Sequence, residues 1–109
     1  MIKTLCFYLL FLSILLSCDR IWDRYEPVLQ EKPDSALREL LSINPEHLLS
    51  PKEKADYHLL LCMALDKSYI DLSTDSLIMP AVKYYANRQP VKKRMMAYYY
   101  LGRLQSNGH

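Results

Sequence analysis

The sequence predicts an all-α protein, a short antiparallel array of helical hairpins that follows an N-terminal signal helix. Three observations lead to this fold class. The 109 residues include only two glycines, Gly102 and Gly108. No stretch shows the regular spacing of strands and turns that a sandwich or barrel needs. Apolar residues instead recur at helical spacing, in segments separated by short polar turns.

The chain begins with a segment typical of an exported protein. Lys3 gives a positive start, Leu5 to Leu16 is an almost unbroken apolar run, and the small residue Ser17 follows. A spanning helix needs roughly 20 apolar residues, whereas the apolar part of a secretory signal has about 7 to 15. We expect a signal peptide over residues 1–17; an uncleaved signal helix and a buried helix are the alternatives.

The end of this segment, Leu15-Leu16-Ser17-Cys18, resembles the signal of a bacterial lipoprotein. The resemblance implies cleavage between Ser17 and Cys18, with Cys18 carrying a thioether-linked diacylglycerol and an N-terminal acyl chain such as palmitate. It also implies a place in the cell envelope, anchored by lipid to the inner or outer membrane and facing the periplasm or the cell surface. Which membrane and which leaflet stay open.

Charge argues against direct binding to nucleic acid. The net charge of +2 falls to +1 when residues 1–17 are removed, because Lys3 is the only charged side chain lost. A nearly neutral chain has no electrostatic attraction for a polyanion as a whole. The single basic cluster, Lys92-Lys93-Arg94, is interpreted as a solvated helix start.

Two short helices are expected before residue 45. The first spans Ile21 to Gln30, ends at Lys32-Pro33 and forms, with the tether, the segment 18–30. Asp34 and Ser35 offer N-cap oxygens for the second, which Asn44-Pro45 terminates. Its apolar residues recur at helical spacing: Ala36, Leu37, Leu40 and Leu41.

A longer helix is predicted from Pro51 to about Lys67. Ser50 can cap the free backbone N–H groups, Pro51 suits the first helical position, and Glu53 completes a capping box. One apolar stripe runs along this helix: Tyr57, Leu60, Leu61, Ala64 and Leu65. The polar residues Lys52, Asp56 and Lys67 fall largely off the stripe.

Two further helices complete the prediction. After a loop over Ser68 to Ser76, a helix begins near Asp75 or Ser76 with Pro80 in its first turn and a half. Its apolar face consists of Ala81, Val82, Tyr84 and Tyr85. A turn over Asn87 to Pro90 leads to a last helix, Val91 to Ser106, with Asn107-Gly108 as its stop.

The last helix resembles the first helix of a tetratricopeptide repeat. Tyr98, Leu101 and Gly102 match the aromatic, leucine and glycine of that pattern, while Gln105 stands where the pattern prefers tyrosine. The same template places Tyr57, Leu60, Leu61 and Ala64 in an earlier first helix, and Ala81 and Tyr85 in its second helix. The two aromatics are 41 residues apart against about 34 in a standard repeat, and the loop after Ser68 accommodates the surplus.

This order of elements resembles bacterial lipoproteins with tetratricopeptide-like repeats. The resemblance implies a helical domain over residues 31–109 that is incomplete at its C-terminus. About three repeats are usually needed for a stable stack, so we expect part of Met95 to Leu104 to be uncovered. Self-association through this last helix, or a truncated gene product, would follow.

No pattern in the chain indicates catalysis, a cofactor or a metal. Phosphate-binding loops, nucleophile elbows, zinc-protease helices and paired-cysteine motifs are missing from the sequence. His58, Cys62 and Asp66 share one side of a helix, where a partly buried face is the preferred interpretation over a metal site. Asp71 and Asp75 do not fit a calcium loop.

Nine tyrosines suggest a role in binding. Tyr57, Tyr85 and Tyr98 are expected in the core, whereas Tyr84, Tyr99 and Tyr100 are candidate contacts for a partner. The first functional hypothesis is a non-catalytic, lipid-anchored helical-repeat module that binds a protein or peptide at a bacterial membrane. The second is the truncated N-terminal sensory or regulatory part of a longer repeat-containing signalling protein. Neither names the partner or the oligomeric state.

Overall fold

The protein is all-helical, as the sequence predicts. A computed structural model describes residues 20–48, 50–70 and 75–107, and within these ranges the chain forms α-helices, two 3₁₀ turns and no strand. The α-helices are α2 (Arg20–Glu31), α3 (Pro33–Leu41), α4 (Pro51–Lys67), α5 (Met79–Tyr85) and α6 (Val91–Asn107), and the 3₁₀ turns are η1 (Pro45–His47) and η2 (Asp75–Leu77). The expected signal peptide, Cys18, Asp71 and Gly108 lie outside the described residues.

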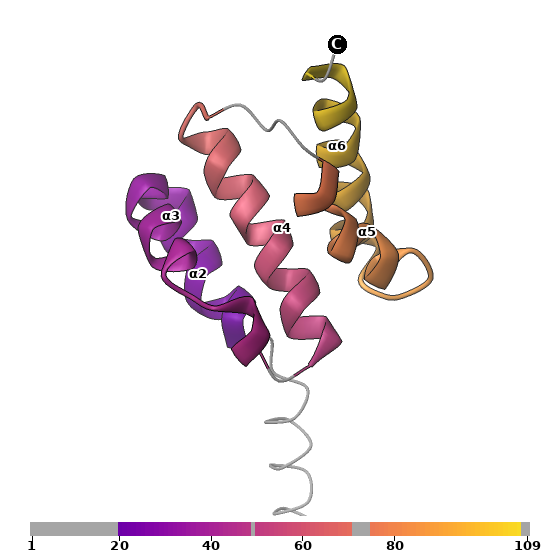
Figure 1. The fold of residues 1–109 in the computed structure, drawn as a ribbon, viewed down its shortest axis with the longest axis horizontal. Coiled ribbons are helices and arrows are strands. Elements are labelled where there is room, and N and C mark those ends of the chain that lie inside the picture. The colour runs from indigo at the N-terminus through magenta and orange to yellow at the C-terminus, as the bar shows by residue number, and fades with distance from the viewer. Residues whose placement is uncertain (1–19, 49, 71–74, 108–109) are drawn as a thin grey trace, which may run out of the picture.

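Helix α4 lies in the middle of the molecule. Figure 1 shows α2 and α3 on one side of it and α5 and α6 on the other, and α4 contacts all four. The core follows α4 because apolar residues from both sides converge on it. Its fully enclosed larger side chains include Leu29, Leu40, Leu59, Leu60, Ile78 and Tyr85.

The bounds of α4 agree with the prediction. The Ser50 hydroxyl accepts a hydrogen bond from the Glu53 backbone N–H at 3.1 Å, and Pro51 occupies the first turn. Burial, however, is not limited to the one expected stripe, since the run from Ala55 to Ala64 is buried except for His58. Helices on two sides of α4 cover faces that a single partner would leave exposed.

Helix α3 starts one residue earlier than its expected caps. Pro33 occupies the first turn, Lys32 stands at the N-cap without a side-chain hydrogen bond, and Asp34 lies inside the helix. The expected capping role of Asp34 and Ser35 is therefore wrong. Proline explains the difference, because it is well suited to the first helical position, where no N–H is needed.

The second half of the chain follows the predicted order. Turn η2 precedes α5, and Pro80 lies in the first turn of α5, where a proline is tolerated. Helix α6 begins at Val91 as expected and packs on α5 and α4. On the far side of α4, the Tyr57 hydroxyl donates a 3.0 Å hydrogen bond to the Leu40 carbonyl and so ties α3 to α4.

Candidate functional site

A charged cluster lies inside the protein where four helices meet. Asp56 of α4 is 1% exposed and Lys93 of α6 is 4% exposed. The Lys93 Nζ lies 3.2 Å from both Asp56 carboxylate oxygens, and the Tyr85 hydroxyl donates to one of them. The ammonium also lies 4.5 Å from the centre of the Trp22 ring, a cation–π distance.

This cluster corrects two expectations. The sequence predicts Lys93 in a solvated helix start and Asp56 off the apolar stripe of its helix, whereas both residues are buried. Each charge is tolerated in the interior because the other compensates it. The negative charge and hydrogen bond of Asp56 add to burial in raising the pKa of Tyr85. With both charges paired and enclosed, the cluster holds helices together and is closed to a substrate.

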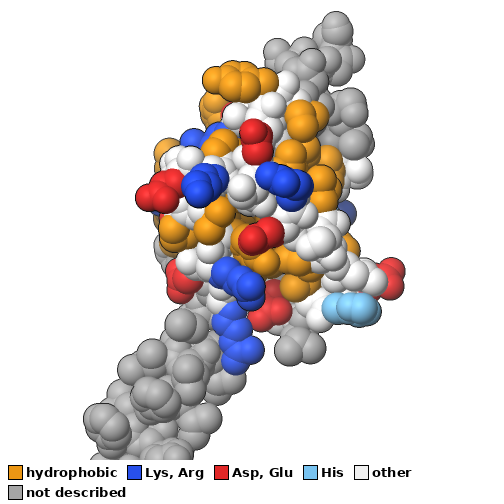
Figure 2. Space-filling view, turned by 90° about the vertical axis from the view of Figure 1, so that its left-hand side faces the viewer, with side chains coloured by type: hydrophobic (Ala, Val, Ile, Leu, Met, Phe, Trp, Pro, Cys, Tyr) orange, Lys and Arg blue, Asp and Glu red, His pale blue; other side chains and the backbone are white. Residues whose placement is uncertain are grey.

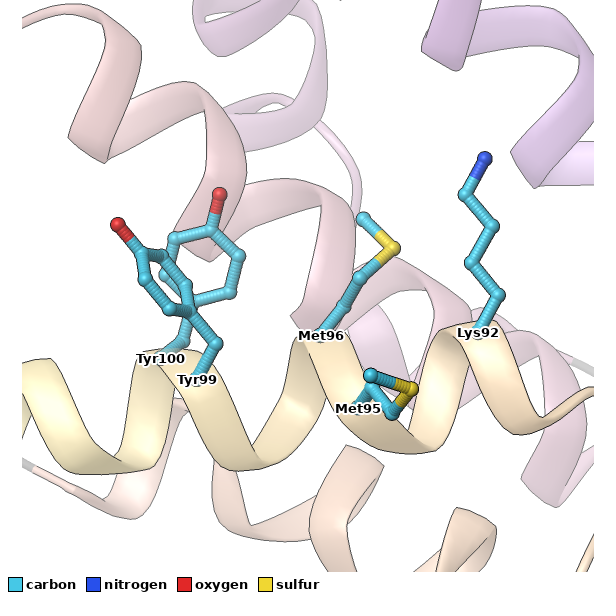
Figure 3. Close-up of a pocket in the computed structure, with 5 residues that line it drawn as sticks. All are labelled: Lys92, Met95, Met96, Tyr99 and Tyr100. Atoms are coloured by element: carbon cyan, nitrogen blue, oxygen red, sulfur yellow. The ribbon is translucent and has the colours of Figure 1, made fainter.

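Helix α6 presents an apolar face to solvent. Met95 is 66% exposed, Tyr99 is 55% exposed and Tyr98 is 49% exposed. Beside them is a groove of about 510 Å³, which we call the α6 groove; its lining residues are Lys92, Met95, Met96, Tyr99 and Tyr100. They follow the spacing i, i+3, i+4, i+7 and i+8, and Figure 3 shows their side chains along one side of the helix.

Tyr99, which lines the α6 groove, is contacted by Arg103. An Arg103 N–H donates to the Tyr99 hydroxyl at 3.3 Å, and the same guanidinium lies 3.0 Å from an Asp66 carboxylate oxygen. The Tyr99 ring meets the Tyr100 ring edge-to-face at a centroid distance of 5.1 Å. Burial raises the pKa of Tyr100 to about 12, so its hydroxyl is neutral at ordinary pH.

The structure divides the tyrosines differently from the prediction. Tyr57 and Tyr85 are buried, but Tyr98, expected in the core, is half-exposed. Tyr100, a candidate partner contact, is buried instead, because Lys93, Ala97 and Tyr100 form the inward stripe of α6. The other two partner candidates differ as well: Tyr99 is exposed and Tyr84 is half-buried.

The remaining repeat positions behave differently in the two halves of the chain. Leu60, Leu61, Ala64 and Ala81 are buried. Gly102 is exposed, and a Cβ atom added there would meet nothing within 4 Å in the part of the chain that the structure describes. In a tetratricopeptide repeat the matching glycine lets a second helix approach closely, because it has no side chain. No described helix approaches Gly102 in this way. Leu101 is partly buried against the core.

The sequence predicts that part of Met95 to Leu104 is uncovered, and the exposure of Met95, Tyr98 and Tyr99 agrees with this. It does not single out Lys92 and Met96 as lining residues of the groove. The sequence does contain a signal for this groove. Met96 and Tyr99 form a second apolar stripe on α6, one position before the inward-facing Ala97 and Tyr100. Asp56 also had a signal, since it precedes Leu59 and Leu60 by three and four residues and so shares a face with them. A polar residue on an apolar stripe predicts a buried partner of opposite charge.

A smaller hollow of about 370 Å³ lies where α2, η1 and the start of α4 meet. It combines cationic Arg20 and Arg24 with anionic Glu53 and with apolar Leu48. Opposite charges within one hollow select no ligand class, so the α6 groove is the stronger candidate.

His58, Cys62 and Asp66, which share one side of α4, do not form a metal site in the described structure. Among the described residues, no group of three His, Cys, Asp or Glu side chains is placed to hold an ion. Burial raises the pKa of Cys62 to about 12 and lowers the pKa of His58. Because the thiolate is the form that binds metal and reacts as a nucleophile, a protonated thiol favours neither role.

Comparison with protein-family models, with curated proteins and with solved structures finds no match for this chain. None of the helices that the structure describes is long and apolar enough to cross a membrane.

Proposed function

We propose that this chain is a non-catalytic helical module, held at a bacterial membrane by lipid on Cys18, that binds a protein or peptide partner. The observation that carries the proposal is the apolar face of α6, with Met95, Tyr98 and Tyr99 about half or more exposed beside a groove.

Residue type supports binding at this face. Tyrosine and methionine are enriched at protein interfaces, tyrosine because it offers a large apolar body with a polar tip. Contiguous apolar side chains on a protein surface commonly mark an interaction site. Arg103 links Tyr99 to Asp66 at this surface, and because these contacts are partly exposed they restrict the Tyr99 side chain only weakly before a partner arrives.

The lipid anchor rests on the sequence around Cys18. A diacylglycerol and an amide-linked acyl chain would anchor far more firmly than the single chain that binds only marginally. Helix α2 begins at Arg20, two residues after Cys18. Lipid on Cys18 would thus place the helical body directly at the membrane surface, and no amphipathic helix would be needed for attachment.

The absence of catalysis is part of the proposal. Within the part of the chain that the structure describes, Asp56, Lys93 and Tyr85 form a close group of reactive side chains, and they bind one another in the interior. Cys62 is buried with a raised pKa. An open site needs a reactive group that faces its ligand, and the α6 groove contributes mainly sulfur and aromatic carbon.

Site-specific photo-crosslinking in intact cells tests the binding proposal. A photoreactive amino acid in place of Met95 should yield a discrete adduct with one partner. The same amino acid in place of Leu41, which is 60% exposed on α3, should yield none. Equal adduct patterns at the two positions would refute a partner at α6.

The anchor has its own test. Cys18→Ala should abolish labelling by a fatty-acid probe and stop normal processing, while far-ultraviolet circular dichroism of the helical body stays unchanged. Labelling that persists in this variant would refute lipidation of Cys18.

A further inference from the structure

We propose that the α6 groove accepts an amphipathic helix whose apolar stripe is bordered by acidic side chains. This inference rests on the proposed function and specifies the partner of the same surface. Three properties carry it: the uneven charge of the chain, the small number of groups in the groove that could bind a peptide backbone, and the spacing of its lining.

Charge is distributed unevenly between the two halves of the protein. Residues 20–70 contain seven Lys and Arg against nine Asp and Glu, whereas residues 75–107 contain six Lys and Arg against one acidic residue, Asp75. Figure 2 shows the side of α2 and α3, where blue and red side chains are interspersed. Helix α6 has no acidic residue at all. Lys93 and Arg103 pair with Asp56 and Asp66, so Lys92 and Arg94 are the cations of α6 that form no ion pair with a described residue. These two cations favour an acidic partner.

Part of this positive charge lies at the N-terminal end of α6, beside the groove. Lys92, Lys93 and Arg94 stand in the first turn, where the positive end of the helix dipole makes cations unfavourable. Asp56 compensates Lys93, but Lys92 is exposed, lines the groove and forms no ion pair with a described residue. A carboxylate of the partner beside Lys92 would offset both the side-chain charge and the dipole.

The lining favours a helix over an extended peptide. An extended peptide needs partners for its backbone N–H and C=O groups, whereas a helix satisfies its own. The polar side-chain atoms of the lining are those of Lys92, Tyr99 and Tyr100, and Tyr100 is buried. Side chains at i, i+3, i+4 and i+7 form the ridges and grooves into which another helix packs.

Met95 and Met96 make the lining of the α6 groove adaptable. Met95 and Met96 lie side by side between Lys92 and the aromatic pair (Figure 3). Methionine is flexible and polarisable, and it accommodates apolar side chains of different shapes. The groove should thus select the partner by its charge and helical form more than by individual apolar residues.

The test uses the full chain in nanodiscs of zwitterionic lipid and two fluorescent peptides of about 16 residues, constrained to be helical. Both peptides carry the same leucine stripe, flanked by glutamates in one and by lysines in the other. Fluorescence anisotropy should show the glutamate peptide binding roughly tenfold more tightly at low salt, with the gap shrinking as salt screens the charges.

Three variants locate the effect. Lys92→Glu should remove most of the preference for the glutamate peptide, and Met95→Glu should abolish its binding. Leu41→Glu, a matched change at a similarly exposed apolar residue on α3, should leave it unchanged. Unaltered circular dichroism shows that each variant is folded.

Equal binding of the two peptides, tighter binding of the lysine peptide, or no binding of either would overturn this inference. A dimer of the full chain that dissociates on Met95→Glu would overturn it as well, because a second copy would then occupy the groove. The crosslink at position 95 decides the proposed function separately: a discrete adduct together with a failed peptide test leaves a partner at α6 that is not an acidic helix.

Discussion

Helices α4 and α6 have the same length, 17 residues, yet they experience opposite environments. Helix α4 has neighbours on two sides, so even its Asp56 is enclosed. Helix α6 has described neighbours on one side, and it exposes methionine and tyrosine on the other. The difference teaches that the number of neighbouring helices, more than apolar content, decides which residues form the core. The residues left over on α6 are the ones available for a partner.

The largest expected effect comes from opening the interior ion pair between these two helices. Asp56→Ala removes the carboxylate that lies 3.2 Å from the buried Lys93 ammonium, which should lower the free energy of unfolding by about 3–5 kcal/mol. Urea denaturation followed by circular dichroism measures the change. The double variant Asp56→Leu with Lys93→Met removes both charges and should recover much of the loss.

The surface pair between the same two helices is the matched control. Arg103 and Asp66 lie 3.0 Å apart but are partly exposed to solvent. Asp66→Ala should cost no more than about 1 kcal/mol, since water screens exposed pairs. Equal losses for Asp56→Ala and Asp66→Ala would contradict the difference in burial between the two pairs.

Truncating apolar side chains tests the same comparison without charge. Leu60→Ala creates a cavity in the fully buried face of α4 and should cost about 2–5 kcal/mol. Met95→Ala removes a solvent-exposed side chain of α6 and should change stability by less than about 0.5 kcal/mol. Comparable losses at the two positions would mean that Met95 is covered in the isolated protein.

Alkaline pH should weaken the packing of α5 and α6 on α4, because Tyr85 and Tyr100 are buried there. Burial raises the pKa of Tyr100 to about 12, and the pKa of Tyr85 is raised as well. A free tyrosine ionises near pH 10, so the folded state retains these protons longer than the unfolded state. Their stabilisation is complete below pH 10 and is lost as the pH rises toward 12.

Urea midpoints between pH 8 and pH 12, together with tyrosinate absorbance, measure this loss. Tyr100→Phe should flatten the pH dependence. A midpoint that stays constant up to pH 12 in the unaltered protein would contradict the burial of these phenols.

The smallest effect is expected at the joint between α3 and α4. Tyr57→Phe removes the hydroxyl that donates to the Leu40 carbonyl and should lower the free energy of unfolding by about 1 kcal/mol. Hydrogen exchange at the end of α3 should accelerate in this variant. No acceleration there would show that the bond does not fasten that end.

The sequence predicts the helices well because their end signals are local. Ser50, Pro51 and Glu53 define the start of α4 within one turn, and the structure contains that cap. Where two local signals compete, as Pro33 does with Asp34 and Ser35, the prediction of the cap fails. Local chemistry thus determines the order of helices and most of their bounds.

The candidate site was harder to predict because it depends on how α6 rotates against α4. Tyr98, Tyr99 and Tyr100 are adjacent and point in three directions, so sequence periodicity alone does not choose the inward one. The choice depends on Lys93, whose partner Asp56 lies 37 residues away in the sequence. Only the packed structure reveals that pairing, and with it the exposure of Tyr98 and the burial of Tyr100.

The pair of Asp56 and Lys93 therefore helps to set the rotation of α6 about its own axis. Consecutive residues on an α-helix are turned by about 100°, so a slip of one position would move Lys92 inward, where Lys93 now meets Asp56. Lys92 would still offer an ammonium to the carboxylate, but the same slip would bring the larger Met96 into the place where Ala97 is fully enclosed, so the ion pair fixes the rotation only together with this small residue. A charge that no partner ever touches thus helps to decide which face of the helix a partner meets.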